Sequence, residues 1–281
     1  MGDLGQDTAV WELGDGVWGA DVSQEWEIWG PMGGYMAAIA LRAAGAAGPA
    51  AAGRRPAAFS CHYLGVAAFA AVQIRVDERK GGRSAASQRV EITQDGRAIL
   101  DAMVWSVAVD EGLEHDETQA PDIAGPDELP SMAELVPPDA KRPFPFWENF
   151  DSKPLMFEPE WPPPGPRPAV WQEWMRFLPT SRFDDPWVDA GRTVILVDLP
   201  SWPAGHRPHA WSSPQWVAPT LDLHVSFHRS TSDHEWLLCD GTAPLSTEGL
   251  LPWSAKVWTP TGQLVASGGG QCLYRRIPPR P

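Results

Sequence analysis

Two stretches of this chain share one order of elements, and this repetition limits the fold more than any other feature. In each, a strand and a helix precede a meander of antiparallel strands. Thr93–Leu100 parallels Thr259–Ala266, and His62–Gly65 parallels Ser226–Arg229, at offsets of roughly 166 and 164 residues. We therefore predict an internal duplication, and chance similarity between hairpins is the alternative.

The first half is patterned as a helix followed by antiparallel strands. Gly33–Ala44 is predicted as a helix that begins soon after Gly30-Pro31, where proline is tolerated. Within Phe59–Val109, apolar and polar side chains alternate with the period of a strand, and Asp95-Gly96 is a hairpin turn signal. Val10–Val22 predicts one or two short strands ahead of the helix.

The second half repeats this pattern. A strand is expected at Val170–Leu178, and a helix over Trp187–Leu199, where Asp184-Asp185-Pro186 provides a capping start. The strands expected after it are Leu221–Arg229, Glu235–Cys239, Leu250–Trp258 and Gln263–Tyr274. Both halves are therefore α+β.

An acidic, proline-rich segment separates the two halves. Residues 110–140 contain ten acids and no Lys or Arg, and 14 of the 30 prolines lie between Pro121 and Pro168. Most of the net charge of −14 comes from this segment, so the net charge does not indicate a charged binding face. Its negative sign argues against a nucleic-acid partner. A connector of this length is expected to wrap the surface or to cover something.

Other classes of protein are disfavoured by what the sequence lacks. No apolar run is long enough for a transmembrane helix, and Met1–Val10 does not resemble a secretory signal. Cys61, Cys239 and Cys272 lack metal-ligand spacing and are expected to be reduced thiols in a cytoplasm. We expect no metal and no cofactor.

Several motifs resemble one family. They are Trp29–Ala38 with Leu41-Arg42-Ala43, Gly81–Ser84 with Gln94–Arg97, and Leu221–Arg229 with Glu235–Leu238 and Gly262–Ser267. Together they resemble the double-hotdog acyl-CoA thioesterases of the thioesterase II type. The resemblance implies two hotdog units in one chain, each a long helix wrapped by a curved antiparallel sheet. It places them at residues 1–110 and 146–281, with residues 111–145 as an acidic, proline-rich linker.

The resemblance also implies a catalytic set. The family holds the attacking water with an Asp, a Thr or Ser, and a Gln. The Asp falls on Asp222, whereas the other two positions fall beside Thr242 and Gln271. A one-residue displacement in a strand turns a side chain to the opposite face, unless a bulge at Gly268–Gly270 restores its direction.

Substrate contacts are expected at both ends of this set. The unpaired N–H groups of the Gly33-Gly34 helix start can polarise a carbonyl, although the glycines are equally explained by close packing of helix on sheet. The resemblance adds Tyr35 to this group and places His228 and Arg229 near the site mouth, where CoA phosphates bind. Each of these polar residues has an ordinary structural explanation as well.

The resulting hypothesis is hydrolysis of acyl-CoA thioesters to free acid and CoA. Two alternatives stay open: a hydratase or acyl transferase on the same scaffold, and a non-catalytic protein that binds acyl thioesters or another apolar ligand. The displaced Thr and Gln motivate the first alternative, and the 16 tryptophans motivate the second. The expected partner is an acyl-CoA or another acyl thioester, without membrane insertion, and a homo-oligomer is allowed.

Overall fold

The structure is a computed structural model that describes all residues except 49–52, 109–110, 138–143, 161–162, 210–215 and 277–281. Its α-helices are α1 (Leu4–Asp7), α2 (Gly33–Ala46), α3 (Met132–Leu135), α4 (Pro186–Asp198) and α5 (Ser201–His206). The described residues also form short 3-10 helices, namely η1 (Gln24–Trp26), η3 (Pro126–Glu128) and η4 (Pro145–Asn149). The expected boundary at residue 110 lies outside the described residues.

The strands of the first half are β1 (Trp11–Gly14), β2 (Val17–Asp21), β3 (Arg54–Tyr63), β4 (Ala71–Lys80), β5 (Ala85–Gln94) and β6 (Arg97–Ala108). Those of the second half are β7 (Phe150–Pro154), β8 (Val170–Phe177), β9 (Trp216–Val217), β10 (Thr220–Phe227), β11 (Trp236–Thr242), β12 (Leu250–Trp258), β13 (Leu264–Leu273) and β14 (Arg275–Arg276). The predicted helices and long strands are confirmed to within a few residues at each end.

One twelve-stranded antiparallel sheet unites the two halves. Its order is β1-β2-β4-β5-β6-β3-β10-β13-β12-β11-β8-β7, while β9 and β14 pair separately. The halves meet where β3 pairs with β10, with Phe59 opposite Val225. Read outward from this junction, β3-β6-β5-β4-β2-β1 matches β10-β13-β12-β11-β8-β7. This is the order that an internal duplication requires.

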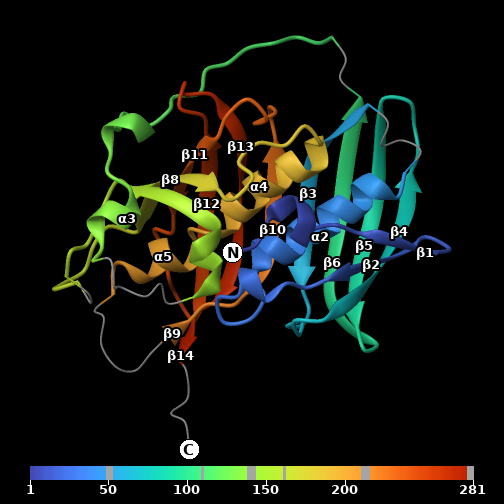
Figure 1. Cartoon of the computed structure of the whole chain (residues 1–281), viewed down its shortest axis with the longest axis horizontal. Coiled ribbons are helices and arrows are strands. Elements are labelled where there is room, and N and C mark those ends of the chain that lie inside the picture. The colour runs from blue at the N-terminus through green and yellow to red at the C-terminus, as the bar shows by residue number, and fades with distance from the viewer. Residues whose placement is uncertain (49–52, 109–110, 138–143, 161–162, 210–215, 277–281) are drawn as a thin grey trace, which may run out of the picture.

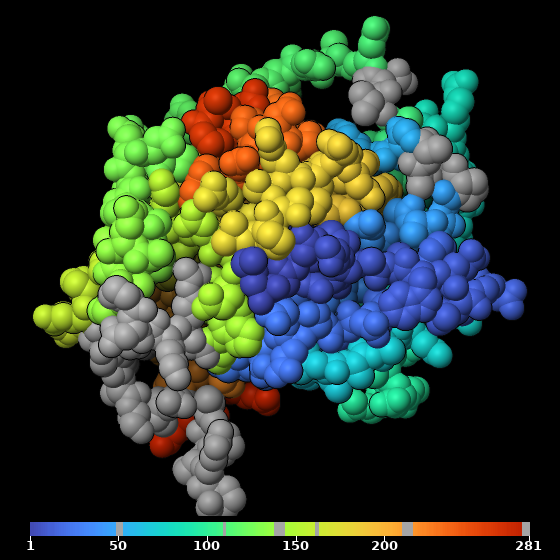
Figure 2. Space-filling model, viewed as in Figure 1, coloured from blue at the N-terminus to red at the C-terminus, as the bar shows by residue number. Residues whose placement is uncertain are grey.

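Both long helices lie on one face of this sheet and pack against each other (Figure 1). Helix α2 contacts β3 to β6, and α4 contacts β10 to β13 as well as β3. The lack of a side chain at Gly34 allows the close approach, because a Cβ added there would lie only 2.8 Å from the Ile195 Cα of α4. The N-terminal residues lie across the helix layer and add Leu4 to its core (Figure 2).

The connector covers the opposite face of the second half. Ile123 and Leu129 pack on a small core of Trp174, Leu238, Trp258 and Leu264. The Trp174 indole donates to the Ala124 carbonyl at 3.0 Å. This agrees with the expectation that a long connector covers part of the surface. The two faces of the sheet are called inner, toward α2 and α4, and outer, toward the connector.

Candidate active site

The N-terminus of α2 has one backbone donor to spare. Met32 caps the helix, and its sulfur accepts from the Tyr35 N–H at 3.3 Å. The Gly34 N–H donates to Asp198 Oδ2 at 2.7 Å. Among the described residues, no acceptor is found for the Gly33 N–H. An unpaired N–H at a helix start is suited to bind an oxygen with negative charge.

Close approach explains why both residues at this start are glycines. A Cβ at Gly34 would lie 2.8 Å from the Ile195 Cα of α4, which is fixed backbone. A Cβ at Gly33 would lie 2.9 Å from Asp198 Oδ2 and 3.3 Å from the Tyr63 hydroxyl. The packing explanation for the glycines is therefore supported, and the same lack of side chains exposes the backbone to an acid.

That acid, Asp198, is the last residue of α4 and is 5% exposed. Besides the Gly34 N–H, it accepts a hydrogen bond from the Thr220 hydroxyl, at 3.3 Å to Oδ1. Burial raises the pKa of Asp198 to about 6, against the opposing effect of these two hydrogen bonds. A carboxyl group that titrates near neutrality can take up and release a proton during a reaction.

Tyr63, Cys61 and Cys272 surround this acid. The Tyr63 hydroxyl is buried without a well-formed hydrogen bond among the described residues, and the Cys61 thiol is its weakly interacting neighbour. Burial raises the pKa of Cys61, and it raises that of Cys272 to about 12. Both stay thiols at neutral pH, so neither is activated as a nucleophile.

Asp222 and Gln271 lie together, but on the outer face. They are directly opposite in the pairing of β10 with β13. Leu223, Val225 and Phe227 are buried toward the helices, so the alternation of the strand turns Asp222 outward. Asp222 forms no ion pair or hydrogen bond among the described residues, including the expected alternatives His224 and Arg229.

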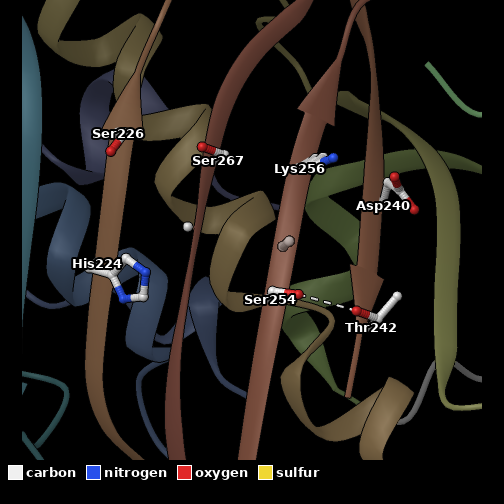
Figure 3. Close-up of a pocket in the computed structure, with 9 residues that line it drawn as sticks. His224, Ser226, Asp240, Thr242, Ser254, Lys256 and Ser267 are labelled. Atoms are coloured by element: carbon white, nitrogen blue, oxygen red, sulfur yellow. Dashed lines mark hydrogen bonds between the residues drawn. The ribbon is translucent and has the colours of Figure 1, made fainter. Parts of the chain in front are cut away.

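Thr242 occupies a different part of the outer face. Its hydroxyl lies 3.2 Å from that of Ser254 in an open depression of about 450 Å³ (Figure 3). The depression is lined by His224, Ser226, Asp240, Thr242, Ser254, Ala255, Lys256, Ser267 and Gly268. Strands β13 and β12 separate β11, which carries Thr242, from β10, which carries Asp222. Of the three residues implied by the resemblance, the structure thus brings only Asp222 and Gln271 together.

The irregularity in this strand pair lies in β10. Gly268, Gly269 and Gly270 pair in unbroken register with Val225, His224 and Leu223, so the bulge that the glycines suggested is not there. The register shifts between Thr220 and Asp222 instead. This shift leaves Thr220 beside Asp198 on the inner face while Asp222 faces outward.

The remaining predicted contacts lie elsewhere. Tyr35 is fully buried, and its hydroxyl donates to the Asp7 carbonyl at 2.7 Å. His228 and Arg229 follow the end of β10 opposite to Thr220, more than about 25 Å along the strand. His228 Nε2 lies 2.9 Å from the Ser267 hydroxyl, and Arg229 pairs with Asp116 of the connector at 2.8 Å. Neither is brought close to Gly33.

The start of α4, at the other end of the helix pair, can be compared with the start of α2. Counted from the first residue of each helix, Trp187 of α4 corresponds to Gly34, and Gly45 of α2 corresponds to Asp198. The Trp187 ring lies 2.5 Å from where a Cβ of Gly45 would be. Pro186 has no N–H, and Asp185 caps the Trp187 N–H at 2.8 Å. Of these two described helix starts, the α2 start is the one that combines a free donor with an acid.

Asp198, Thr220 and Tyr63 were not predicted as site residues. For Asp198 a signal was present, because it ends the apolar run Val194–Val197 in a helix whose C-terminus disfavours negative charge. A buried acid at such a position needs a partner. The partner, Gly34, lies 164 residues away and is found only in the folded chain. No group of three or more potential metal ligands occurs among the described residues, and none of the described helices is long and apolar enough to span a bilayer.

Comparison with known proteins identifies the family. The acyl-CoA thioesterase N-terminal domain matches residues 22–107, and the acyl-CoA thioesterase C-terminal domain matches residues 126–272. The acyl-CoA thioesterase II TesB2 from Mycobacterium marinum is 21% identical, with a TM-score of 0.78 over 98% of this chain and 99% of that one. The TesB protein from Mycobacterium avium subs paratuberculosis is 19% identical, with a TM-score of 0.75 over 97% and 98% of the two chains.

A third solved structure carries the fold without an assigned activity. It is a conserved protein of unknown function with a hot dog fold from Alicyclobacillus acidocaldarius, 20% identical, with a TM-score of 0.75 over 99% of this chain and 98% of that one. These likenesses confirm the expected α+β fold of two hotdog units. Since the matched domains span both halves, the chain belongs to the acyl-CoA thioesterase family.

Proposed function

We propose that this chain hydrolyses acyl-CoA thioesters at the start of α2, with the Gly33 N–H as carbonyl donor and Asp198 as the acid that activates water. One observation supports this placement: the free Gly33 N–H and the Asp198 carboxylate lie next to each other. Asp198 Oδ2 is 2.9 Å from the position that a Cβ of Gly33 would occupy, and it accepts from the neighbouring Gly34 N–H. Thioester hydrolysis needs this pair, a base for the water and a donor for the oxyanion.

The proposed reaction moves one negative charge within the helix start. Ionised Asp198 accepts a proton from water, whose oxygen attacks the thioester carbon. The carbonyl oxygen becomes an oxyanion on the Gly33 N–H just as Asp198 becomes neutral, so the total charge near the helix N-terminus is unchanged. Collapse breaks the carbon–sulfur bond, and Asp198 returns the proton to the departing sulfur of CoA. The products are the free acid and CoA.

The environment of Asp198 supports both halves of this cycle. Its pKa of about 6 leaves the carboxyl mostly ionised at neutral pH, yet basic enough to accept a proton. Hydrogen bonds from Gly34 and Thr220 fix its orientation. The Tyr63 hydroxyl, 3.3 Å from the Cβ position of Gly33, is a further donor close to where the substrate oxygen would lie.

A second placement of the water is the one that the family resemblance implies. Asp222 and Gln271 are directly opposite on neighbouring strands and share the outer face, which favours a joint role. In this placement Thr242 would have to reach the same water from β11, where its hydroxyl is hydrogen-bonded to that of Ser254. The sheet itself separates this set from the Gly33 donor. We therefore keep it as the second candidate.

A product analysis tests the proposal and its alternatives together. The wild-type chain is incubated with short, medium, long and aromatic acyl-CoAs, and free CoA and free acid are quantified by mass spectrometry. We expect the two products in equal amounts, a loss of about 10²–10⁴-fold in kcat for Asp198→Asn, and little change for Asp222→Asn.

Other results would redirect the assignment. Tight binding without turnover across the whole panel would identify a binding protein. A product other than free acid and CoA would identify a hydratase or acyl transferase. Loss of activity in Asp222→Asn, but not in Asp198→Asn, would indicate that the attacking water is activated by Asp222 on the outer face.

A further inference from the structure

A basic depression lies at the α4 start, the end of the helix pair opposite to Asp198. Its volume is about 610 Å³, within the range of small-molecule sites. Its lining, here called the arginine pocket, consists of Val10, Arg42, Gly45, Ala46, Gly53, Arg54, Arg55, Asp185, Pro186 and Trp187. Three arginines and one aspartate thus line the depression, in a protein whose net charge is −14.

Backbone contacts hold these arginines in place. Arg54 Nη2 donates to the carbonyls of Gly82 and Arg83, the latter at 3.1 Å. Arg55 Nη1 donates to the Phe227 carbonyl at 3.3 Å. The guanidinium groups come from α2 and from β3, so two separate elements position them. Such anchoring reduces the side-chain entropy that a bound anion would otherwise have to remove.

Two donors in this group lack acceptors. Arg42 Nη1 and Arg54 Nη1 are buried and form no hydrogen bond in the described part of the chain. The carboxylate of Asp185 lies 3.6 Å from Arg42 Nη2 and already accepts from the Trp187 N–H, so it offsets only part of the positive charge. Buried unpaired donors are uncommon and indicate a missing acceptor.

We propose that the arginine pocket binds a ligand through a phosphate or diphosphate group, at a site separate from the candidate active site. Planar guanidinium groups recognise phosphate oxygens through paired hydrogen bonds, which suits a cluster with spare donors. The helix start contributes little, because Pro186 has no N–H and Asp185 occupies the next one. The 14 residues of α2 separate the pocket from Gly33 by about 20 Å.

Binding of pyrophosphate to the full chain tests this site. We expect saturable binding by isothermal titration calorimetry and a rise in melting temperature. Arg42→Met and Arg54→Met keep most of the side-chain volume, and each should weaken binding about tenfold or more. The matched control is Arg97→Met, at the exposed first residue of β6, which should bind as the wild type does.

One variant should strengthen binding, which a damaged fold cannot imitate. Asp185→Asn removes the carboxylate found among the described residues of the pocket, while asparagine still caps α4. We expect tighter pyrophosphate binding for it. Absence of binding to the wild type, or equal affinity of wild type, Arg42→Met and Arg54→Met, would overturn the proposal.

ADP and free CoA identify the source of the phosphate. If the ligand is a nucleotide, ADP binding weakens in Arg42→Met and Arg54→Met, and this supports the site. If it is CoA, the affinity for CoA falls in the same variants. A third result is that Arg42→Met and Arg54→Met lose pyrophosphate binding but bind CoA as the wild type does. In that case CoA binds at the candidate active site, and the arginine pocket binds another phosphate ligand.

Discussion

The two ends of the α2–α4 pair occupy corresponding places in the duplicated fold, yet they differ in chemistry. At the α2 start, Gly34 meets Asp198, whereas at the α4 start Trp187 meets Gly45. The first end has a carboxylate and a free backbone donor. The second end is filled by an indole ring and capped by Asp185. One duplicated scaffold therefore offers one helix start with a free donor beside an acid and another whose first N–H groups are absent or capped.

The difference teaches that the site depends on two positions rather than on the scaffold. The order of the six main strands and the place of the long helix on the sheet are the same in both halves. A glycine in place of the tryptophan, and an aspartate in place of the glycine, change what the helix start can bind. Function must therefore be argued from the residues of each end, because the fold alone does not distinguish them.

Removal of the indole at the α4 start is expected to have the largest effect on stability. Trp187 is 5% exposed, and Trp187→Ala should lower the free energy of unfolding by about 3–5 kcal/mol, through the cavity it leaves. The turnover of the folded protein should persist, because the candidate site lies at the other end. Urea denaturation and steady-state kinetics measure both. Trp105→Ala, at a 39% exposed position, is the control and should cost less than about 1 kcal/mol. A turnover loss as large as that of Asp198→Asn would show that the two ends are not independent.

The buried acid makes the α2 start sensitive to pH. The pKa of Asp198 is raised from 3.8 to about 6, so the folded state favours the neutral form. Its contribution to stability is fully present below pH 3.8 and is lost as the pH rises through 6. Relative to Asp198→Asn, the wild type should lose about 2–2.5 kcal/mol between pH 4 and pH 7. Urea denaturation of both proteins at the two pH values measures this. A constant difference would contradict a buried carboxyl with a raised pKa.

A smaller effect is expected where the helices touch. Gly34→Ala places a Cβ 2.8 Å from the Ile195 Cα and should destabilise the protein by about 1–3 kcal/mol. Gly191→Ala is the matched control on the facing helix, where the new Cβ has ordinary contacts at 3.5 Å. It should stabilise by roughly 0.5 kcal/mol, because alanine favours the helix. Thermal unfolding compares the two variants, and equal destabilisation of both would show that the helix contact is no closer at Gly34.

Much of the fold was predictable, because period and turn signals are local. The alternation of Val72–Asp77 and the Asp95-Gly96 turn place β4 and the β5–β6 hairpin without tertiary information. The same alternation also shows that Asp222 faces away from the helices, since Leu223, Val225 and Phe227 must face them.

The candidate site was less predictable, because its members are distant in sequence. Asp198 meets Gly34 across 164 residues, and the bulge that turns Thr220 toward Asp198 leaves no residue signature. The resemblance pointed to Asp222 through its matching neighbours Phe227, His228 and Arg229. Which acid lies beside the helix start is decided by the packing of α4 on α2.

The pH dependence of kcat/KM for wild type, Asp198→Asn and Asp222→Asn tests the central claim most directly. We predict that wild type and Asp222→Asn lose activity together as the pH falls through about 6, where Asp198 becomes protonated. Asp198→Asn should show low activity that does not fall further as the pH drops through about 6. If the fall in kcat/KM at low pH persists in Asp198→Asn and disappears in Asp222→Asn, the account is contradicted. The attacking water would then be activated by Asp222 on the outer face of the sheet.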